Sequence, residues 1–173
     1  TVQASIDKYY PGTKLAISEY NFGGDNVSAT IAMVEALGCY ADKGVYLATL
    51  WGGNGYQFAG INLYTNYNKK GGAFGDLLIP AVTDDVSLCS AYAARSSTDD
   101  GILTVSLTNK SETDALNAVL TLEGAQSDYQ TAEVWAVYGD STKIRLLEGA
   151  AVLEGDQVNV TLPAYCAAML VLK

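Results

Sequence analysis

The spacing of apolar residues along the chain changes near residue 85. Before that point, two apolar runs of strand length, at 14–19 and 45–51, are each followed by apolar residues three and four positions apart, as on one face of a helix. A helical stretch over residues 1–10 comes first and ends at a Pro-Gly pair. The order helix, strand, helix, strand, helix predicts two consecutive βα units of a parallel sheet, and we expect its second strand to be buried on both faces.

The two helices that follow these strands each have a predicted inner face. Either Asn26 or Ser28 can cap the first helix. Its apolar face is expected to comprise four residues at helical spacing: Ile31, Val34, Leu37 and Ala41. The second helix is expected to turn three larger residues inward: Phe58, Ile61 and Tyr64.

From residue 86 onward the apolar period is two. Leu103, Val105 and Leu107 alternate with Thr and Ser, and similar alternation recurs toward the end of the chain. Seven strands are predicted: 86–94, 101–108, 117–123, 132–138, 143–147, 157–162 and 165–172. Short strands at this spacing are typical of an antiparallel β-sandwich, which we expect to fold on its own. The predicted fold is therefore α/β plus all-β, with a barrel-like segment over residues 1–80 and a sandwich domain over residues 81–173.

Composition supports two regions of different character. Residues 1–80 carry five basic and six acidic residues, a net charge of −1, whereas residues 81–173 carry five and thirteen, a net charge of −8. Twelve of the seventeen aromatic residues precede residue 81. The total charge of −9 without a basic patch argues against a nucleic-acid partner. No apolar run is long enough to predict a membrane span.

The residue types that are absent or scattered exclude several chemistries. The chain has no histidine, which removes Ser-His-Asp and Cys-His nucleophiles and the commonest zinc ligands. Cys39, Cys89 and Cys166 are an odd number without a CxxC pair, so we interpret them as small buried hydrophobic residues rather than as disulfide partners. Neither a calcium-binding loop nor a P-loop motif occurs. We therefore expect no metal and no cofactor.

The stretch KLAISEYNFGG, residues 14–24, is the strongest candidate for a functional site. Apolar strand residues lead to Glu19, which lies among aromatic and amide side chains before two glycines break the strand. In α/β folds, the loops at the carboxyl ends of parallel strands gather the chemistry. Glu19 is therefore the candidate catalytic residue, with a surface salt bridge as the alternative. Asp25 is expected to be a loop or helix-start acid.

Trp51 ends the second predicted strand as Glu19 ends the first. Its flat apolar face suits stacking against sugar C–H groups, whereas closing a core is the alternative. Asn21, Asn54 and Tyr56 carry groups that can hydrogen-bond sugar hydroxyls. Trp135, in EVWAVY, is expected to be a sandwich residue rather than part of a second sugar site.

Four stretches resemble a known enzyme family: ISEYNFGG, VYLATLW, INLYTNYNKKGGAFGD and the ending LPAYCAAMLVLK. With them, the chain resembles the C-terminal part of glycoside hydrolase family 44. These enzymes are retaining endo-β-1,4-glucanases and xyloglucanases built from a (β/α)8 barrel and a β-sandwich. The likeness is specific over residues 14–24 and 61–76 and generic in the sandwich. It implies that residues 1–75 are the last two βα units of the barrel, since 173 residues are too few for a whole one of about 250.

The resemblance also implies roles for individual residues. Glu19 matches the catalytic nucleophile, and Trp51 matches the aromatic residue that floors the subsite next to the cleaved bond. Tyr20 and Asn21 are neighbours of the nucleophile with supporting roles. The family's acid/base glutamate lies in an Asn-Glu-Pro-type motif, which this sequence lacks. Because retaining hydrolysis needs two carboxyl groups about 5–5.5 Å apart, we expect this chain alone to be inactive.

Two functions therefore remain open. The first is the C-terminal portion of a retaining endo-β-1,4-glucanase that carries the nucleophile. The second is a non-catalytic carbohydrate-binding or structural β-sandwich module of a plant-cell-wall-degrading enzyme. For both, the resemblance implies a β-1,4-glucan partner and a secreted, extracellular protein. The missing N-terminal barrel portion, or a second copy of the chain, is expected to cover the open barrel face.

Overall fold

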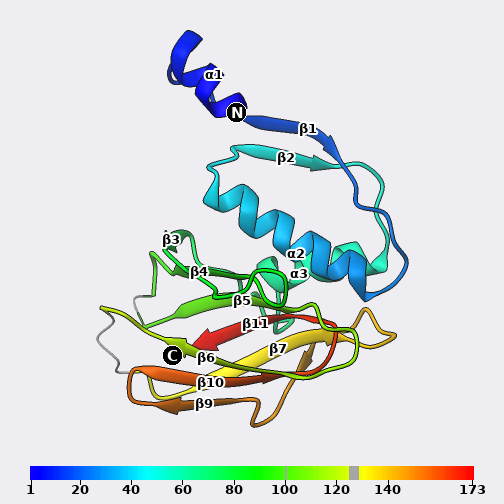
Figure 1. Cartoon of the computed structure of the whole chain (residues 1–173), viewed down its shortest axis with the longest axis vertical. Helices are drawn as coiled ribbons and strands as arrows, with labels where there is room; N and C mark the ends of the chain where they lie inside the picture. The colour runs from blue at the N-terminus through cyan, green and yellow to red at the C-terminus, as the bar shows by residue number, and fades with distance from the viewer. Residues whose placement is uncertain (100, 125–128) are drawn as a thin grey trace.

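The computed structural model describes residues 1–99, 101–124 and 129–173, and its elements stack in layers (Figure 1). The outer elements are helix α1 (Val2–Tyr9) and a parallel two-stranded ribbon of β1 (Ala16–Tyr20) and β2 (Leu47–Leu50). Helices α2 (Val27–Asp42) and α3 (Gly55–Thr65) form the next layer, and two β-sheets follow. The predicted order of helices and strands over the first 65 residues is therefore observed.

The remaining strands form a six-stranded sheet of order β3-β4-β5-β11-β7-β8 and a three-stranded sheet of order β6-β10-β9. Every pairing in them is antiparallel. The strand bounds are β3 Leu77–Ile79, β4 Ala91–Arg95, β5 Leu103–Asn109, β6 Leu116–Thr121, β7 Ala132–Tyr138, β8 Arg145–Leu146, β9 Ala151–Glu154, β10 Gln157–Leu162 and β11 Cys166–Leu172.

The β-sandwich expected from the period of two is present, and the structure corrects its details. Two strands were not predicted: β3, which lies before residue 81, and β9, which forms a hairpin with β10. The predicted strand 86–94 begins only at Ala91. The residues before it are held in a turn, because Asp85 Oδ1 accepts hydrogen bonds from the amide and the hydroxyl of Ser87.

The main hydrophobic core lies between the two sheets. Leu107 of β5, Val134 of β7 and Leu170 of β11 point from the larger sheet toward Val158 and Leu162 of β10. All five side chains are almost completely buried. Each such burial contributes about 1.5–3 kcal/mol, so this core is the main source of stability.

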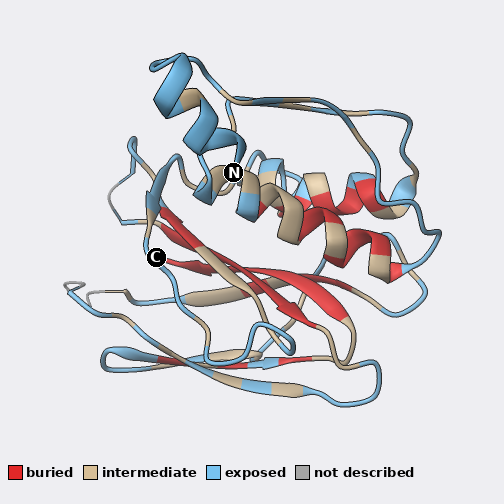
Figure 2. Ribbon diagram, turned by 45° about the horizontal axis from the view of Figure 1, so that its top comes forward, coloured by how far each residue is buried: buried red, intermediate tan, exposed pale blue. Residues whose placement is uncertain are grey.

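The opposite face of the six-stranded sheet is buried as well, under α2 and α3 (Figure 2). Met169 and Val171 of β11 belong to one cluster with Val34 of α2 and Leu63 of α3. Every residue of β11 is therefore buried. This burial argues against our expectation of a sandwich that folds on its own, because separating it from the helices would expose one apolar face of its larger sheet.

The polar half of the β5 alternation lies under these helices rather than in water. Thr104, Ser106 and Thr108 are each about 1% exposed. Ser106 Oγ lies 2.8 Å from the Tyr64 hydroxyl, Thr104 Oγ1 donates to a β4 carbonyl oxygen at 3.1 Å, and Thr108 Oγ1 donates to Glu35 Oε1 at 3.1 Å. In the described part of the chain, every buried side-chain nitrogen and oxygen has a hydrogen-bond partner. The apolar residues of β5 therefore face the core between the two sheets, whereas its Thr and Ser residues form hydrogen bonds on the helix-covered face.

The buried face of α3 agrees only in part with the predicted one, since Tyr64 packs inward as expected. Ala59 and Leu63 are buried, whereas Phe58 is exposed. Gly60 lies directly against α2, where an added Cβ would come within 2.8 Å of Met33 Cβ. Small residues at this crossing let the two helices approach closely, and the large aromatic side chain is left outside.

Helix α2 agrees better with the prediction. Asn26 is its N-cap, and its side-chain oxygen accepts a hydrogen bond from the amide of Ser28 at 2.9 Å. Ile31 and Val34 are buried as expected, whereas Leu37 is only partly buried. The helical spacing therefore identified the correct side of α2.

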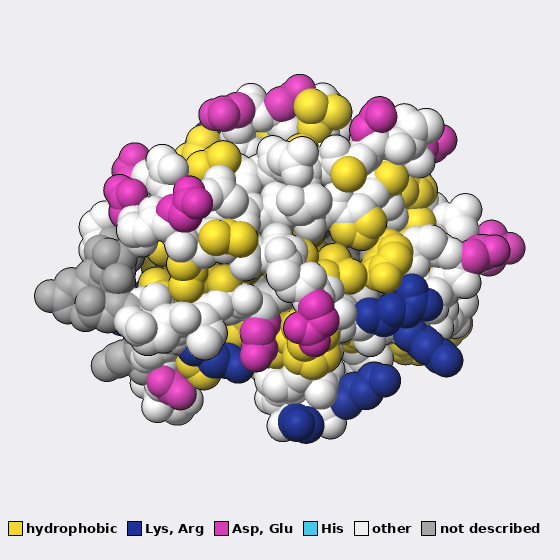
Figure 3. Space-filling view, turned by 90° about the horizontal axis from the view of Figure 1, so that it is seen from below, with side chains coloured by type: hydrophobic (Ala, Val, Ile, Leu, Met, Phe, Trp, Pro, Cys, Tyr) yellow, Lys and Arg dark blue, Asp and Glu magenta, His cyan; other side chains and the backbone are white. Residues whose placement is uncertain are grey.

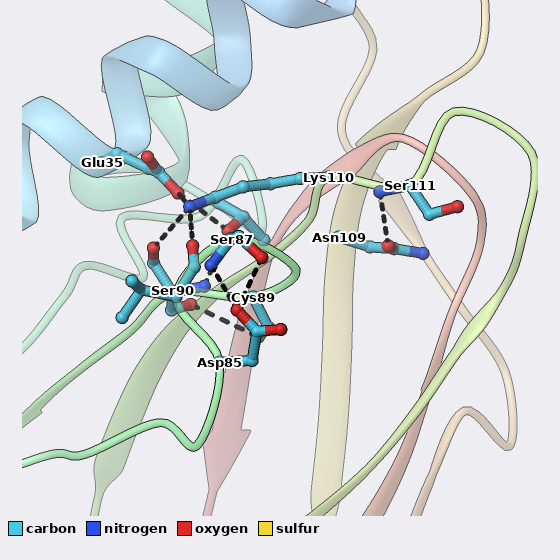
Figure 4. A network of polar contacts seen from close by, with 10 residues as sticks. Glu35, Asp85, Ser87, Cys89, Ser90, Asn109, Lys110 and Ser111 are labelled. Carbon is cyan, nitrogen blue, oxygen red and sulfur yellow. Dashed lines mark hydrogen bonds and ion pairs between the residues drawn. The ribbon is translucent and has the colours of Figure 1, made fainter.

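An ion pair fastens α2 to the edge of the sandwich (Figure 4). Lys110, which follows β5, places its Nζ 2.7 Å from Glu35 Oε1. The same ammonium group donates to Ser90 Oγ at 3.0 Å and to the carbonyl oxygen of Val86. Because the two charged side chains are only 24% and 30% exposed, water screens this pair less than an ordinary surface pair.

The three cysteines are free thiols. Cys166 pairs with Asn109 in the ladder, and backbone bonds to Leu88 and Ser90 place Cys89 on the other side of Asn109. The two cysteines are therefore two strand spacings or about 9.5 Å apart, which is too far for a disulfide. Burial raises the pKa of both thiols, that of Cys166 to about 12. Cys39 is exposed, so our interpretation as buried hydrophobic residues is wrong for Cys39.

The β1–β2 ribbon is the least covered part of the sheet structure (Figure 2). The prediction that residues 45–51 are buried on both faces is wrong for this chain, because Tyr46 and Leu47 are exposed. One side of the ribbon faces α2, whereas alternate residues on its other side remain uncovered. Within the described ranges, no helix has the length and apolarity to cross a membrane.

Candidate functional site

The two strands of the ribbon end side by side, and the predicted site lies at this end. The register of the β1–β2 pairing shifts between Ile17 and Tyr20. Ser18 and Glu19 therefore stand opposite the single residue Thr49 of β2. A bulge of this kind bends the strand and re-aims its side chains, and bulges are common beside active sites.

Glu19 is exposed at this bulge. In the described part of the chain its carboxylate has neither a hydrogen-bond nor an ion-pair partner, so the alternative of a surface salt bridge finds no partner there. Asp25, the next acid along the chain, acts on Tyr56 instead, because its charge helps to raise the pKa of that tyrosine. The carboxylate of Glu19 is therefore free to meet a group from outside these residues.

Trp51 comes directly after β2 and presents its side chain to solvent. Its indole is part of a residue that is 68% exposed, which argues against the alternative of a core tryptophan. Its backbone is held firmly: its amide donates to the carbonyl oxygen of Tyr20 at 3.0 Å, and its carbonyl oxygen accepts from Asn21 Nδ2 at 2.6 Å. A fixed backbone with a free indole face is what stacking on a sugar ring requires.

Asn21 is occupied by the protein itself. Besides the bond to Trp51, its Oδ1 accepts hydrogen bonds from Gly23 N at 2.6 Å and from Gln57 Nε2 at 2.8 Å. The structure therefore makes Asn21 a brace between the two strand ends. Gln57, which is only 1% exposed, was absent from our predicted site. Its sequence signal was the spacing of a capping box, three residues after Asn54.

Asn54 is likewise engaged inside the chain. It is the N-cap of α3, where its Oδ1 accepts from the amides of Tyr56 at 2.9 Å and Gln57 at 3.2 Å. Its Nδ2 donates to the carbonyl oxygen of Gly24, in the loop after β1. This amide thus joins the loop after β1 to the start of α3, which occupies its oxygen and one of its two N–H donors.

Tyr56 lies at the border between this site and the sandwich. Its hydroxyl is 3.5 Å from Asp140 Oδ1, in the loop after β7. Lost hydration and the nearby Asp140 carboxylate raise the pKa of Tyr56, so the hydroxyl stays protonated. At the neighbouring Gly55, an added Cβ would come within 3.2 Å of the Thr142 methyl group. The sandwich therefore reaches the edge of the site through this loop.

Tyr20 points toward α2. Its hydroxyl contacts Met33 Sδ at 3.6 Å, and its ring packs edge-on against Tyr40 at 5.5 Å and obliquely against Phe22 at 5.6 Å. Burial and the neighbouring Tyr40 raise the pKa of Tyr20. Tyr20 thus attaches the ribbon to the helix layer.

The described residues contain no group of three or more His, Cys, Asp or Glu side chains that could hold a metal ion. Trp135, the other tryptophan, packs on Tyr67 with ring centroids 6.0 Å apart, and its Nε1 donates to Glu133 Oε2 at 3.2 Å. This contact makes Trp135 a packing residue of the sandwich.

The chain is similar in sequence and in structure to several known proteins. The chain is 37% identical over 178 residues to Endoglucanase A of Paenibacillus lautus, an alignment that covers 99% of this chain and 25% of that protein. A family 44 endoglucanase from Clostridium thermocellum is 39% identical with a TM-score of 0.94. A family 44 xyloglucanase from Paenibacillus polymyxa, solved with xyloglucan, is 35% identical with a TM-score of 0.93. Both matches cover 99% of this chain and 34% of the solved chain. No protein-family model matches the chain.

Both its fold and its sequence are similar to those of glycoside hydrolases. Within that class it is similar, throughout its length, to the C-terminal part of family 44 endoglucanases and xyloglucanases, as the motifs in residues 14–24 and 61–76 predicted. The chain spans 25% of Endoglucanase A and 34% of the two solved chains named above.

Proposed function

We propose that this chain is the C-terminal portion of a retaining endo-β-1,4-glucanase and supplies its nucleophile, Glu19. The observation that carries the proposal is the exposed, unpaired carboxylate at the β1 bulge, next to the exposed Trp51. Both residues lie at the carboxyl ends of parallel strands, where such folds place their chemistry.

The proposed mechanism needs one carboxylate from this chain and one from elsewhere. Glu19 attacks the anomeric carbon of the sugar and forms a covalent glycosyl-enzyme, while a second carboxyl group protonates the leaving oxygen. The second group then removes a proton from the water that releases the sugar. No motif of this sequence offers that acid/base, so we assign it to residues outside this chain. Trp51 would hold the sugar ring by stacking.

The proposed substrates are β-1,4-linked glucans, including xyloglucan. Support comes from the similar proteins, which are named endoglucanases and xyloglucanases, one of them solved with xyloglucan. Because such polymers are too large to enter a cell, we also propose a secreted protein. The exposed side of the ribbon is then covered by the rest of the barrel.

The carbohydrate-binding alternative finds less support. Sugar-binding surfaces use exposed aromatic side chains for stacking, and the strands of the smaller sheet, β6, β9 and β10, contain no aromatic residue. On the face seen in Figure 3, acidic side chains are spread around the surface, and most Lys and Arg side chains in view gather toward one side.

The direct test replaces the matching third of the Clostridium thermocellum enzyme with this chain and measures reducing-sugar release from xyloglucan. We expect hydrolysis by the chimera and a fall in kcat of several orders of magnitude on Glu19→Gln, with substrate binding retained because only the covalent step is lost. Asp25→Asn is the matched control and is expected to stay active.

Two results would contradict the proposal. A chimera that keeps its turnover after Glu19→Gln would remove the nucleophile role. Release of sugar by the isolated chain, lost on Glu19→Gln, would show that a complete site forms without a second carboxylate from elsewhere.

A further inference from the structure

Gln57 is an amide side chain that is almost completely buried. It is 1% exposed, in the first turn of α3. Burying an amide is unfavourable by a few kcal/mol unless its donors and acceptor are paired. Its bonds therefore show what the residue does.

The two ends of this amide serve different parts of the chain. Gln57 Oε1 accepts the backbone amide of Asn54 at 3.0 Å, which completes the capping box of α3. Gln57 Nε2 donates to Asn21 Oδ1 at 2.8 Å and lies 3.5 Å from the carbonyl oxygen of Gly23. The oxygen end is thus local, whereas the nitrogen end reaches the loop after β1, more than thirty residues earlier.

Asn21 connects Gln57 to the end of the second strand through hydrogen bonds at both ends of its amide. Its Oδ1 is held by Gln57 and Gly23, which leaves its Nδ2 aimed at the carbonyl oxygen of Trp51, 2.6 Å away. Asn21 also lies only two residues after Glu19. One buried amide therefore orients the side chain that joins the end of β1 to the end of β2.

We propose that Gln57 is a positioning residue, which sets through Asn21 the relative placement of the strand ends that carry Glu19 and Trp51. The catalytic meaning of this placement rests on the proposed function, whereas the linkage itself does not. A test on the isolated chain therefore separates the two, because it needs no hydrolysis.

The competing explanation is that Gln57 serves only to cap α3. The variant Gln57→Glu distinguishes capping from positioning. Glutamate has the same shape as glutamine and still accepts a hydrogen bond from the Asn54 amide, and its negative charge is favourable at a helix N-terminus. At about pH 8.5 its carboxylate has no proton to donate to Asn21. Capping alone therefore predicts a wild-type site in Gln57→Glu, whereas positioning predicts a disturbed one.

The experiment is two-dimensional nitrogen–proton NMR of the 173-residue chain, which contains two tryptophans, Trp51 and Trp135. We expect Gln57→Glu and Gln57→Leu to move the backbone and indole signals of Trp51 and leave those of Trp135 in place. Hydrogen exchange of the Trp51 amide, bonded to Tyr20, should accelerate about tenfold, as for loss of one buried hydrogen bond.

Two further variants calibrate this result. Asn21→Ala, at an exposed position, removes the same link from its other end and sets the size of the full effect. Gln3→Leu removes an exposed amide, bonded only to Asp7 of α1, and should leave both tryptophans unchanged. If Gln57→Leu fails to fold, Gln57→Glu and Asn21→Ala decide the outcome. Unchanged Trp51 signals and exchange in folded Gln57→Glu would overturn the proposal.

Discussion

Strand β11, at the centre of the sandwich, and strand β1 of the ribbon both begin as apolar segments of the sequence, yet their burial in the structure is opposite. Every residue of β11 is buried, whereas no residue of β1 is. β11 has paired neighbours on both sides and covering layers on both faces; β1 has one paired neighbour and faces α2 on one side. Stability is therefore concentrated in the sandwich, and the candidate chemistry is concentrated where the chain is least covered.

Removing the helix layer is expected to have the largest effect on this contrast. Residues 81–173 alone lack β3 and expose Val137, Met169 and Val171, which α2 and α3 cover in the whole chain. We expect a broad, non-cooperative thermal transition by circular dichroism and binding of a hydrophobic dye. A sharp transition at the same temperature as the whole chain would show that the helices add nothing to the sandwich.

A matched pair of leucines measures the same contrast residue by residue. Leu170→Ala in β11 leaves a cavity between the sheets and should lower the free energy of unfolding by about 2–5 kcal/mol. Leu47→Ala in β2 removes an exposed side chain and should change it by less than about 0.5 kcal/mol. Urea titration of both variants provides the comparison, and equal losses would mean that the ribbon is as tightly packed as the core.

The ion pair between α2 and the sandwich is expected to contribute a smaller amount. A double-mutant cycle of Glu35→Gln and Lys110→Met should give a coupling of about 1 kcal/mol, because the pair is partly buried and further hydrogen-bonded. The exposed pair Asp42–Lys43 is the control, and its coupling should be close to zero. Equal coupling in both cycles would contradict the role of burial.

The smallest expected effect lies at Asp85 in the loop before β4. Hydrogen bonds from the hydroxyl and the amide of Ser87 lower the pKa of Asp85 below its ordinary value of 3.8. Its stabilisation is therefore complete above that value and is lost as the pH falls through the lower pKa of the folded state. Unfolding free energies of Asp85→Asn should fall less steeply below about pH 5 than those of the parent chain. An identical pH slope would show that these bonds do not persist in solution.

The local pattern of apolar and polar residues was sufficient to locate a strand or a helix cap where neighbouring residues alone determine it. The alternation over residues 157–162 and the apolar ending located β10 and β11 almost to the residue. The glutamate and the tryptophan that follow apolar runs were correctly expected at strand ends, because strand length and the following glycines are written in neighbouring residues. The same applies to the N-cap Asn26.

The same pattern did not predict the surroundings of a side chain where another layer of the fold packs against it. The alternation of β5 does not say whether its Thr and Ser face meets water or a helix that carries hydrogen-bond partners. Helical spacing in residues 55–65 correctly placed Tyr64 on the inner face, but only the close crossing with α2 decided that Ala59 and Gly60 are buried while Phe58 is exposed.

The sequence by itself thus determined the order of helices and strands over the first 65 residues, most strands of the sandwich, the resemblance to a glycoside hydrolase family and the candidates Glu19 and Trp51. Only the tertiary structure decided that Asn21 and Asn54 brace the chain and that Gln57 lies buried between them. The reason is physical: a side-chain amide offers the same donors and acceptor wherever it stands. What it binds depends on which backbone groups from distant segments are brought within about 3 Å of it.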